Sequence, residues 1–448
     1  MSIDPSIFKA YDIRGTYPDQ VNADVAYKIG YALAAILGPH TVAVGRDMRG
    51  SSDELFESLA RGITDQGADV VDLGLISTDG LYFAVGKFGF DSGVMITASH
   101  NPKEYNGFKI CKKMAEPLSG SDGLDKLLDY IKNNTIPETK NPERGVINRR
   151  NIDTDYAAHC LSFIDVHKLK PFKVVIDAGN GMAGKTVPPV LEKLPLHTIP
   201  LFFELDGNFP NHPASPIELE NLRALQAKIA EVNADFGVAF DGDADRMFLV
   251  DRNGTQVGGD MVTALVAKSL LKKHADETVV YNLICSRAVP ELVERNGGTP
   301  IRSRVGHALI KPLMKKHNAI FGGEHSGHFY FRENWFADSG LIAFLVATEL
   351  LSEENRPLHE MVADINPYVR SGEINSRVDS IPDKIEAVSK AFEDGEQDRM
   401  DGLTVQYDDW WFNLRPSNTE PLLRLNVEAG DKELLDQKVE KLLSIIRS

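Results

Sequence analysis

Three aspartates, Asp241, Asp243 and Asp245, alternate along a short segment that follows the apolar run 236–240. Alternate side chains of an extended segment share a face, so the three carboxylates can converge on one hard cation such as Mg²⁺ or Ca²⁺. A calcium-binding EF-hand is excluded, because its loop needs Gly at the sixth position and Glu at the twelfth, where this chain has Arg246 and Arg252. The alternative is a solvated acidic turn, but three close carboxylates repel one another unless they are neutralised. The pattern therefore predicts a metal site.

A second polar segment, Thr97-Ala-Ser-His-Asn-Pro102, follows the apolar run 93–96. It places a hydroxyl, an imidazole and an amide in one tight turn, where Ser99 could act as a nucleophile or carry a phosphoryl group. Ser, Asn and Pro are also ordinary turn residues, so a purely structural turn is the alternative for this segment taken alone.

A third segment, Gly323-Glu-His-Ser-Gly-His328, combines a carboxylate, a hydroxyl and two imidazoles. A zinc protease motif would need His-Glu-x-x-His on a helix, whereas the order here is different and the glycines disfavour a helix. Glu324, Ser326 and His328 are therefore predicted to form a polar loop that orients sugar hydroxyls. The alternative is an ordinary loop with surface histidines.

A fourth segment, Arg415-Pro-Ser-Asn-Thr419, joins a guanidinium to two hydroxyls, an amide and a turn-forming backbone. Such a set can cradle a phosphate. The candidate phosphate-binding residues are Arg415, Ser417, Asn418 and Thr419. A hydrophilic turn between two strands is the alternative.

The segment Gly179-Asn-Gly-Met-Ala-Gly-Lys-Thr186 matches the nucleotide P-loop pattern, and it also fits Gly-x-Gly-x-x-Gly with Glu204 as a ribose-binding acid. It would make the protein a nucleotide-dependent enzyme or a dehydrogenase. Pro188 and Pro189 crowd the helix that should follow, and neither reading gives a task to the other polar segments. We interpret the segment as a structural turn between a strand and a helix.

The elements that must position these residues recur three times, each time as a strand, a turn, an amphipathic helix, a second strand, and later a third strand that ends in a polar segment. The third strands are predicted at 93–96, 236–240 and 319–321. Strands that alternate with helices indicate parallel α/β sheets, whose ligands gather beyond the carboxyl ends of the strands. The three polar segments are therefore expected to face one shared site.

The remainder of the chain does not repeat this pattern. Strands are predicted there near 403–407, 410–414 and 422–427, and a helix over 431–446. We expect a smaller α+β domain there. The predicted domains are 1–150, 151–255, 256–367 and 368–448, and they carry in turn the Ser99 turn, the aspartates, the Glu324 loop and the Arg415 loop.

Composition limits the class of protein. The 448 residues are 42% hydrophobic and 25% charged, which is typical of a soluble multidomain protein. The net charge of −16 disfavours nucleic acid and anionic lipid as partners. No apolar run is long enough to span a bilayer, and the first residues lack the pattern of a signal peptide. Three scattered cysteines suit a reducing compartment, so we expect a cytoplasmic protein.

Together, the four polar segments resemble the α-D-phosphohexomutase superfamily in order and spacing, over essentially the whole chain. The resemblance implies three similar α/β domains with mixed sheets and a smaller C-terminal α+β domain around a central cleft. It also implies a phosphoserine at Ser99, and Mg²⁺ held by Ser99 and the three aspartates. The same resemblance assigns catalytic or binding roles to further residues, namely Tyr11, Arg14, Lys109, Arg246 and His307.

The segment Glu324-His-Ser-Gly-His328 resembles the sugar-specificity loop of this superfamily, and it is most similar to that of phosphomannomutases and bifunctional phosphomannomutase/phosphoglucomutases. The implied reaction interconverts hexose 1-phosphate and hexose 6-phosphate through a hexose 1,6-bisphosphate, with either Lys109 or His307 handling the sugar proton. Sugar phosphates are the implied small-molecule partners, for a monomer or homodimer. The P-loop enzyme and a non-catalytic sugar-phosphate sensor are the alternatives from other classes.

Overall fold

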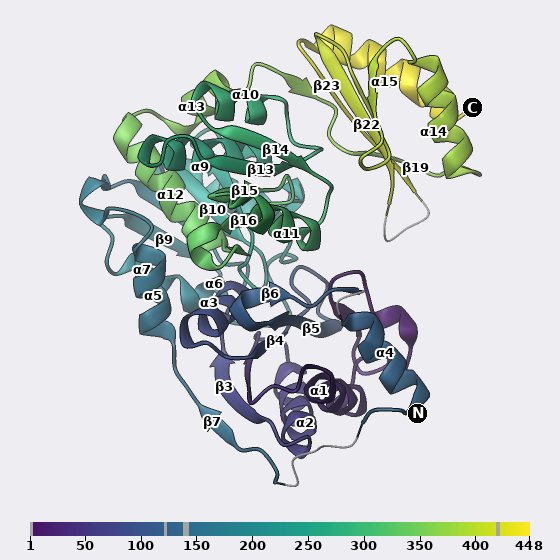
Figure 1. Ribbon diagram of the computed structural model, residues 1–448. Coiled ribbons are helices and arrows are strands. Elements are labelled where there is room, and N and C mark those ends of the chain that lie inside the picture. Colours follow the sequence, from purple (N-terminus) through teal and green to yellow (C-terminus); the bar gives the residue numbers. More distant parts are fainter. Residues whose placement is uncertain (1–2, 121–122, 138–142, 418–421) are drawn as a thin grey trace.

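Four sheets follow one another along the chain (Figure 1) and define four units, I to IV. The computed structural model describes residues 3–120, 123–137, 143–417 and 422–448. The sheets of units I to III mix parallel and antiparallel pairs, whereas the sheet of unit IV is antiparallel. The predicted fold class, three similar α/β units and a C-terminal α+β unit, is confirmed.

Unit I has the strand order β1-β5-β4-β2-β3-β7, with β6 paired to β5. Its strands are β1 (Ile13–Thr16), β2 (Thr41–Arg46), β3 (Asp69–Leu75), β4 (Ser92–Ile96), β5 (Tyr105–Lys112), β6 (Glu116–Pro117) and β7 (Ile147–Arg149). Its α-helices are α1 (Ala23–Leu37), α2 (Ser52–Asp65), α3 (Thr78–Phe88) and α4 (Leu124–Asn133).

Unit II has the order β12-β11-β10-β8-β9. Its strands are β8 (Lys173–Asp177), β9 (His197–Leu201), β10 (Phe236–Phe240), β11 (Met247–Asp251) and β12 (Gln256–Val257). Its helices are α5 (Asp153–Leu161), α6 (Ala183–Thr186), α7 (Pro188–Leu191) and α8 (Arg223–Val232).

Unit III has the order β14-β13-β15-β16-β17. Its strands are β13 (Thr278–Asn282), β14 (Thr299–Ser303), β15 (Phe321–Gly323), β16 (Phe329–Phe331) and β17 (Ala337–Asp338). Its helices are α9 (Gly259–Lys273), α10 (Ala288–Arg295), α11 (His307–His317), α12 (Gly340–Glu354) and α13 (Leu358–Ile365).

Unit IV has the order β18-β23-β22-β21-β20, with β19 paired to β23. Its strands are β18 (Val369–Arg370), β19 (Ile374–Ser376), β20 (Glu396–Asp398), β21 (Leu403–Gln406), β22 (Trp410–Pro416) and β23 (Leu423–Ala429). The helices α14 (Ile381–Ala391) and α15 (Lys432–Ile446) cover one face of this sheet (Figure 1).

The polar segments of units I to III occupy equivalent places. In each unit a central strand, β4, β10 or β15, runs parallel to its neighbour on one side and antiparallel to the next strand in sequence. The Ser99 turn, the aspartates and the Glu324 loop each connect that central strand to the antiparallel one. The predicted repetition is therefore present in the strand pairing itself.

One predicted strand is displaced. The strand expected at 319–321 is β15, Phe321–Gly323. The displacement arises because the amide of Ala319 bonds to the carbonyl of Met314, 2.9 Å away, and so completes the end of α11 instead of entering the sheet.

The longest apolar stretch of the sequence lies in α12, where every residue from Gly340 to Ser352 is buried. A helix that is apolar on all sides belongs inside a large core, and α12 packs against α9, α5 and β11. None of the helices in the described part of the chain has the length and hydrophobicity that a membrane span needs.

The apolar core of units I, II and III includes a cluster that all three share, besides a second cluster within unit I, while unit IV has a core of its own. One cluster joins residues such as Phe83 of α3, Phe240 of β10 and Phe344 of α12. A separate cluster contains Phe412, Leu425 and Leu442 of unit IV. Units I to III thus form one packed block to which unit IV is attached.

The P-loop-like segment forms a tight turn with two short helices, α6 and α7. Gly179 and Asn180 take left-handed backbone angles (φ 52° and 59°), and Pro188 begins α7. The Lys185 ammonium pairs with Asp153 at 2.7 Å, and the Met182 amide donates to the carbonyl of Gly242 at 2.9 Å. The segment is therefore a structural turn between a strand and a helix, as predicted, and it also supports the aspartate loop through the bond to Gly242.

Candidate active site

Ser99 lies in a turn at the end of β4 and is almost fully buried, with 3% of its surface exposed. Its backbone is left-handed (φ 51°), and its amide donates to Thr97 Oγ1 at 2.9 Å. Its hydroxyl donates to Asp241 Oδ2 at 2.7 Å and accepts from Arg246 Nη2 at 3.3 Å. The turn thus presents one hydroxyl to an acid and a cation.

The three aspartates follow β10 and converge as the sequence predicted. One carboxylate oxygen from each of the three lies within 4.8 Å of the other two, and all three residues are buried. The loop approaches the Ser99 turn so closely that a Cβ on Gly242 would lie 2.5 Å from the carbonyl oxygen of Ser99. Burial raises the pKa of Asp241, and the guanidinium of Arg246, 3.0 Å from Asp241 Oδ2, opposes that rise.

The aspartate cluster fits a divalent cation. Asp243 Oδ1 and Asp245 Oδ1 are buried and have no hydrogen-bond partner among the described residues. Such orphaned carboxylate oxygens are costly unless a cation compensates them, and oxygen donors are what Mg²⁺ prefers. The donor set therefore suits a hard metal ion.

Lys109, on β5, reaches into the same cluster. Its ammonium pairs with Asp243 Oδ2 at 2.7 Å and with Asp245 Oδ2. Burial works to lower the pKa of Lys109, but the neighbouring carboxylates of Asp243 and Asp245 outweigh it and raise that pKa. Lys109 is thus held as a cation within the aspartate cluster.

Two further basic residues approach the Ser99 turn. Arg14, on β1, donates to Asn101 of the turn and pairs with Asp12 at 2.6 Å. His100 Nδ1 lies 3.3 Å from Ser99 Oγ. The positive charge of Arg246 lowers the pKa of His100, whose side chain is exposed to solvent.

The Glu324 loop joins the cluster through His328. The backbones of His328 and Arg246 form a β-bridge, and His328 Nδ1 lies 2.8 Å from Asp338 Oδ2 and 3.9 Å from Asp245 Oδ1. Asp338 also pairs with the buried ammonium of Lys311 at 2.8 Å. The imidazole of His328 is therefore oriented beside the aspartates, and Ser326 is half-buried in the same loop.

Glu324 is 2% exposed and already bonded within the protein. It accepts hydrogen bonds from the Tyr330 hydroxyl, from Asn282 Nδ2 at 3.4 Å and from the Gly306 amide at 3.3 Å. Tyr11 of unit I lies against the same place, since a Cβ on Gly306 would be 2.6 Å from its hydroxyl. His307 begins α11 directly after Gly306, but its side chain is not among those described.

Arg415 lies apart from this cluster, on β22 of unit IV, and is 4% exposed. Its Nη2 donates to Glu373 Oε2 at 3.1 Å, and Arg424, its cross-strand partner on β23, pairs with the other oxygen of Glu373 at 3.4 Å. The Nε atoms of both arginines are buried without a hydrogen-bond partner among the described residues. Ser417 is described, whereas Asn418 and Thr419 lie outside the described residues.

Sequence reasoning missed several residues that shape the site. Arg49 is 3% exposed and donates to the carbonyls of Ser99 (2.8 Å), Asn101 (2.7 Å), Pro102 (2.7 Å) and Tyr105 (2.9 Å), so it clamps the Ser99 turn. The other missed residues are Thr78, Lys311, Asp338, Glu373 and Arg424. Their only signal in the sequence is a polar side chain, near a strand end or, for Lys311, within a helix, which many surface residues share.

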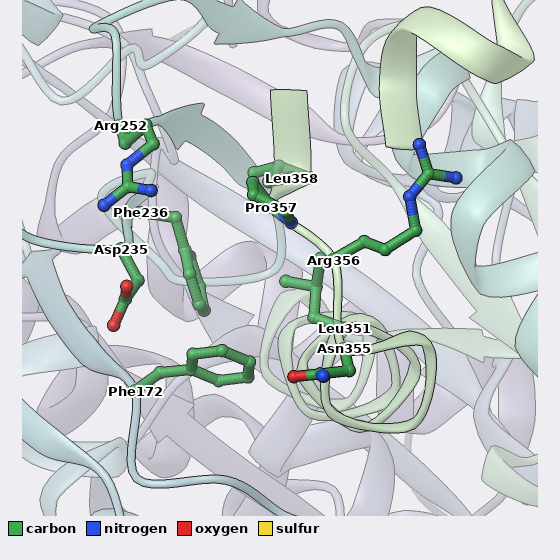
Figure 2. A pocket seen from close by; sticks show the side chains of 9 residues that line it. All are labelled: Phe172, Asp235, Phe236, Arg252, Leu351, Asn355, Arg356, Pro357 and Leu358. Atoms are coloured by element: carbon green, nitrogen blue, oxygen red, sulfur yellow. The ribbon is translucent and has the colours of Figure 1, made fainter. Parts of the chain in front are cut away.

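A pocket of about 200 Å³, drawn in Figure 2, lies elsewhere. Asp235, Phe236 and Phe172 line it at the start of β10, whereas the aspartates follow the end of that strand. Arg356 points away from it in Figure 2 and pairs with Asp364 and Glu360. This pocket holds none of the candidate residues.

Comparison with known proteins identifies the family. Four models of phosphoglucomutase/phosphomannomutase match in order: α/β/α domain I over residues 5–137, domain II over 154–254, domain III over 258–368 and the C-terminal domain over 373–444. The chain belongs to the phosphoglucomutase/phosphomannomutase family. As a member of it, the chain is a hexose phosphate mutase, an isomerase that moves a phosphoryl group within a sugar phosphate, and the P-loop alternative is not favoured.

Relatives of this family member align with nearly the whole of its chain. A protein described as a phosphohexose mutase from Xanthomonas campestris is 41% identical, over 98% of this chain and 99% of its own length. A phosphomannomutase from Escherichia coli is 39% identical, over 98% of each chain. The crystal structure of a family protein from Burkholderia thailandensis superposes with a TM-score of 0.90 at 33% identity, covering 99% of this chain and 98% of the other.

Proposed function

We propose that this mutase interconverts the 1- and 6-phosphates of mannose and glucose, with phosphorylated Ser99 as the phosphoryl carrier and a hexose 1,6-bisphosphate as the intermediate. The observation that carries the proposal is the place of the Ser99 hydroxyl, 2.7 Å from Asp241 and between the aspartate cluster and Arg246. Phosphoryl transfer needs little covalent chemistry from a protein beyond positioning and charge stabilisation, and this arrangement offers both.

The proposed reaction has two balanced halves. In the first, the bond from phosphorus to Ser99 Oγ breaks, a bond from phosphorus to a sugar hydroxyl oxygen forms, and the hydroxyl proton passes to a base. In the second, the bond from phosphorus to the other sugar oxygen breaks, phosphorus bonds to Ser99 Oγ, and the base returns its proton to the sugar oxygen that is released. Asp241, Asp243 and Asp245 would hold Mg²⁺, which when bound neutralises charge on the transferring group. Arg246, Lys109 and Arg14 add positive charge around it.

The proton on the sugar hydroxyl needs an acceptor near Ser99. Lys109 and His307 are the candidates from the sequence. The ammonium of Lys109 is committed to Asp243 and Asp245, which favours its cationic role over proton acceptance. His328 is a third candidate, because an imidazole whose Nδ1 is bound to a carboxylate is held in one orientation for proton transfer at its other nitrogen.

Glu324, Ser326 and Tyr11 are proposed to bind the sugar, and the Arg415 loop to bind the phosphate that is not being transferred. The separate core of unit IV supports a hinge near Pro367 that would let this loop close on the bisphosphate.

We propose that the boundaries between the four domains lie near residues 150, 255 and 367. The buried free thiols of Cys111, Cys160 and Cys285 support a reducing compartment, the cytoplasm.

A coupled assay tests the proposed function. Mannose 1-phosphate, glucose 1-phosphate and glucosamine 1-phosphate are supplied in turn, with Mg²⁺ and a trace of hexose 1,6-bisphosphate. We expect the first two to be converted to 6-phosphates faster than the third, with no nucleotide present. Turnover that requires ATP and disappears in Lys185→Ala would favour the P-loop enzyme, and binding without turnover would favour a sensor.

Arg415→Ala should reduce kcat/KM by roughly 10- to 150-fold, since charge-assisted hydrogen bonds contribute about 1.5–3 kcal/mol. Binding energy at the remote phosphate positions the reacting end, so kcat should fall as well as KM rise. Arg415→Lys should recover only part of the loss, because an ammonium lacks the planar fork of a guanidinium. Steady-state kinetics with and without added bisphosphate measure both effects.

The matched control for Arg415 is Arg399→Ala. Arg399 lies in the same unit, is half exposed and pairs with Glu386 at 3.0 Å, so its removal should leave the kinetics unchanged. Equal kinetics for Arg415→Ala and the wild type would remove the Arg415 loop from the mechanism.

A further inference from the structure

We propose that Thr78, a residue of unit I, positions Asp243 of unit II as a metal ligand. This inference rests on the proposed function, because it assigns an orienting partner to the proposed metal site. Thr78 is the first residue of α3 and lies outside the four polar segments that the sequence singles out. Its side chain and that of Asp243 are both fully buried.

Two hydrogen bonds tie Thr78 to Asp243. The hydroxyl Oγ1 of Thr78 donates to Asp243 Oδ2 at 2.5 Å, and the amide of Thr78 donates to the backbone carbonyl of Asp243 at 3.0 Å. One bond fixes the carboxylate and the other fixes the backbone that carries it. Together they leave the carboxylate little freedom to rotate.

These bonds to Oδ2 also fix the direction of the other carboxylate oxygen of Asp243, Oδ1. Thr78 and Lys109 both bind Oδ2 of Asp243, whereas Oδ1 is buried without a hydrogen-bond partner among the described residues. A carboxylate whose one oxygen is held by donors presents the second in a fixed direction. Thr78 thus keeps Oδ1 of Asp243 available to a cation.

Several hydrogen bonds hold the first turn of α3 in place, and with it Thr78. Ser77 caps the helix by accepting from the Gly80 amide at 3.3 Å, and Asp79 accepts from Ser77 Oγ and from the Gly80 amide. Asp79 also accepts from Ser339 Oγ at 2.6 Å, and Ser339 is the N-cap of α12 in unit III. The residues around Thr78 are therefore anchored to all three α/β units.

The expected magnitude follows from how metal sites respond to loss of their outer partners. Residues that hydrogen-bond a ligating side chain usually change metal affinity by about 10- to 100-fold when they are removed. Valine has the shape of threonine but no donor, so Thr78→Val removes the bond to Oδ2 and keeps the packing. Thr78→Ser keeps the hydroxyl and loses only a methyl group.

The test measures metal binding directly, on the intact purified enzyme without sugar. Mn²⁺ is titrated and the free ion is followed by electron paramagnetic resonance. We expect Thr78→Val to weaken Mn²⁺ binding by about 10- to 100-fold, and Thr78→Ser to stay within about 3-fold of the wild type. In activity assays, the Mg²⁺ concentration for half-maximal rate should rise in Thr78→Val while KM for the sugar phosphate stays near the wild-type value.

Thr348→Val is the matched control. Thr348 is equally buried, and its hydroxyl donates to the carbonyl of Phe344 within α12, at 2.7 Å. The same chemical change there should leave Mn²⁺ binding unaltered. If Thr78→Val does not fold, Thr78→Ala takes its place with the same expected loss.

A double mutant separates an effect through Asp243 from a general disturbance. In an Asp243→Ala background, Thr78→Val should cause no further loss of Mn²⁺ affinity, because its target is gone. Wild-type affinity in Thr78→Val, or an equal loss in both backgrounds, would overturn the inference. Failure of the wild type itself to bind Mn²⁺ would instead count against the proposed metal site.

Discussion

Ser99→Ala should lower turnover by at least about 1,000-fold while sugar-phosphate binding stays near the wild-type level, since removal of a group that carries the transferred fragment affects chemistry and not affinity. Alanine has no oxygen to carry the phosphoryl group. The turn itself should persist, because Arg49 holds it through backbone carbonyls that the substitution does not touch. The measurement is kcat with a trace of bisphosphate, beside calorimetric binding of the sugar phosphate.

Two further results bear on the role of Ser99. Intact mass of the active wild type should include a phosphorylated species that maps to Ser99. Ser269→Ala is the control, because Ser269 is buried on α9 and its hydroxyl has no hydrogen-bond partner among the described residues. Near-wild-type turnover by Ser99→Ala would reject Ser99 as the carrier.

Asp243→Asn should weaken metal binding and slow phosphoryl transfer by about 100-fold or more, because one of three converging carboxylates loses its charge. The same change removes one of the two carboxylates that hold Lys109. Chelation by EDTA should abolish activity of the wild type, and added Mg²⁺ should restore it. The measurements are initial rates across a range of Mg²⁺ concentrations and the metal affinity of the resting enzyme.

Asp235→Asn serves as the control for this charge removal. Asp235 stands just before β10, at the opposite end of the strand from Asp243, and accepts a bond from the Lys173 amide at 2.8 Å. Its loss should change neither metal affinity nor rate. Wild-type activity that is indifferent to chelation would exclude a catalytic role for a metal at the aspartates.

The four polar segments could be predicted because each is local in sequence. A polar cluster directly after an apolar run marks a strand end, and the repetition of that pattern marks equivalent strands. The turn after β8 is an instructive case, since its letters match a P-loop. Its place in the fold, with Lys185 paired to Asp153 and Met182 bonded to Gly242, is structural.

Sequence alone therefore determined the class of fold, the repeated unit and the residues Ser99, Asp241, Asp243 and Asp245 as a candidate set. Only the tertiary structure decided which side chains support them. Thr78 and Asp243 lie 165 positions apart, and Lys109 and Asp243 lie 134 apart. Such pairs leave no periodic or local pattern in the sequence, because packing of one unit against another creates their contact, and that packing depends on the whole buried surface of both.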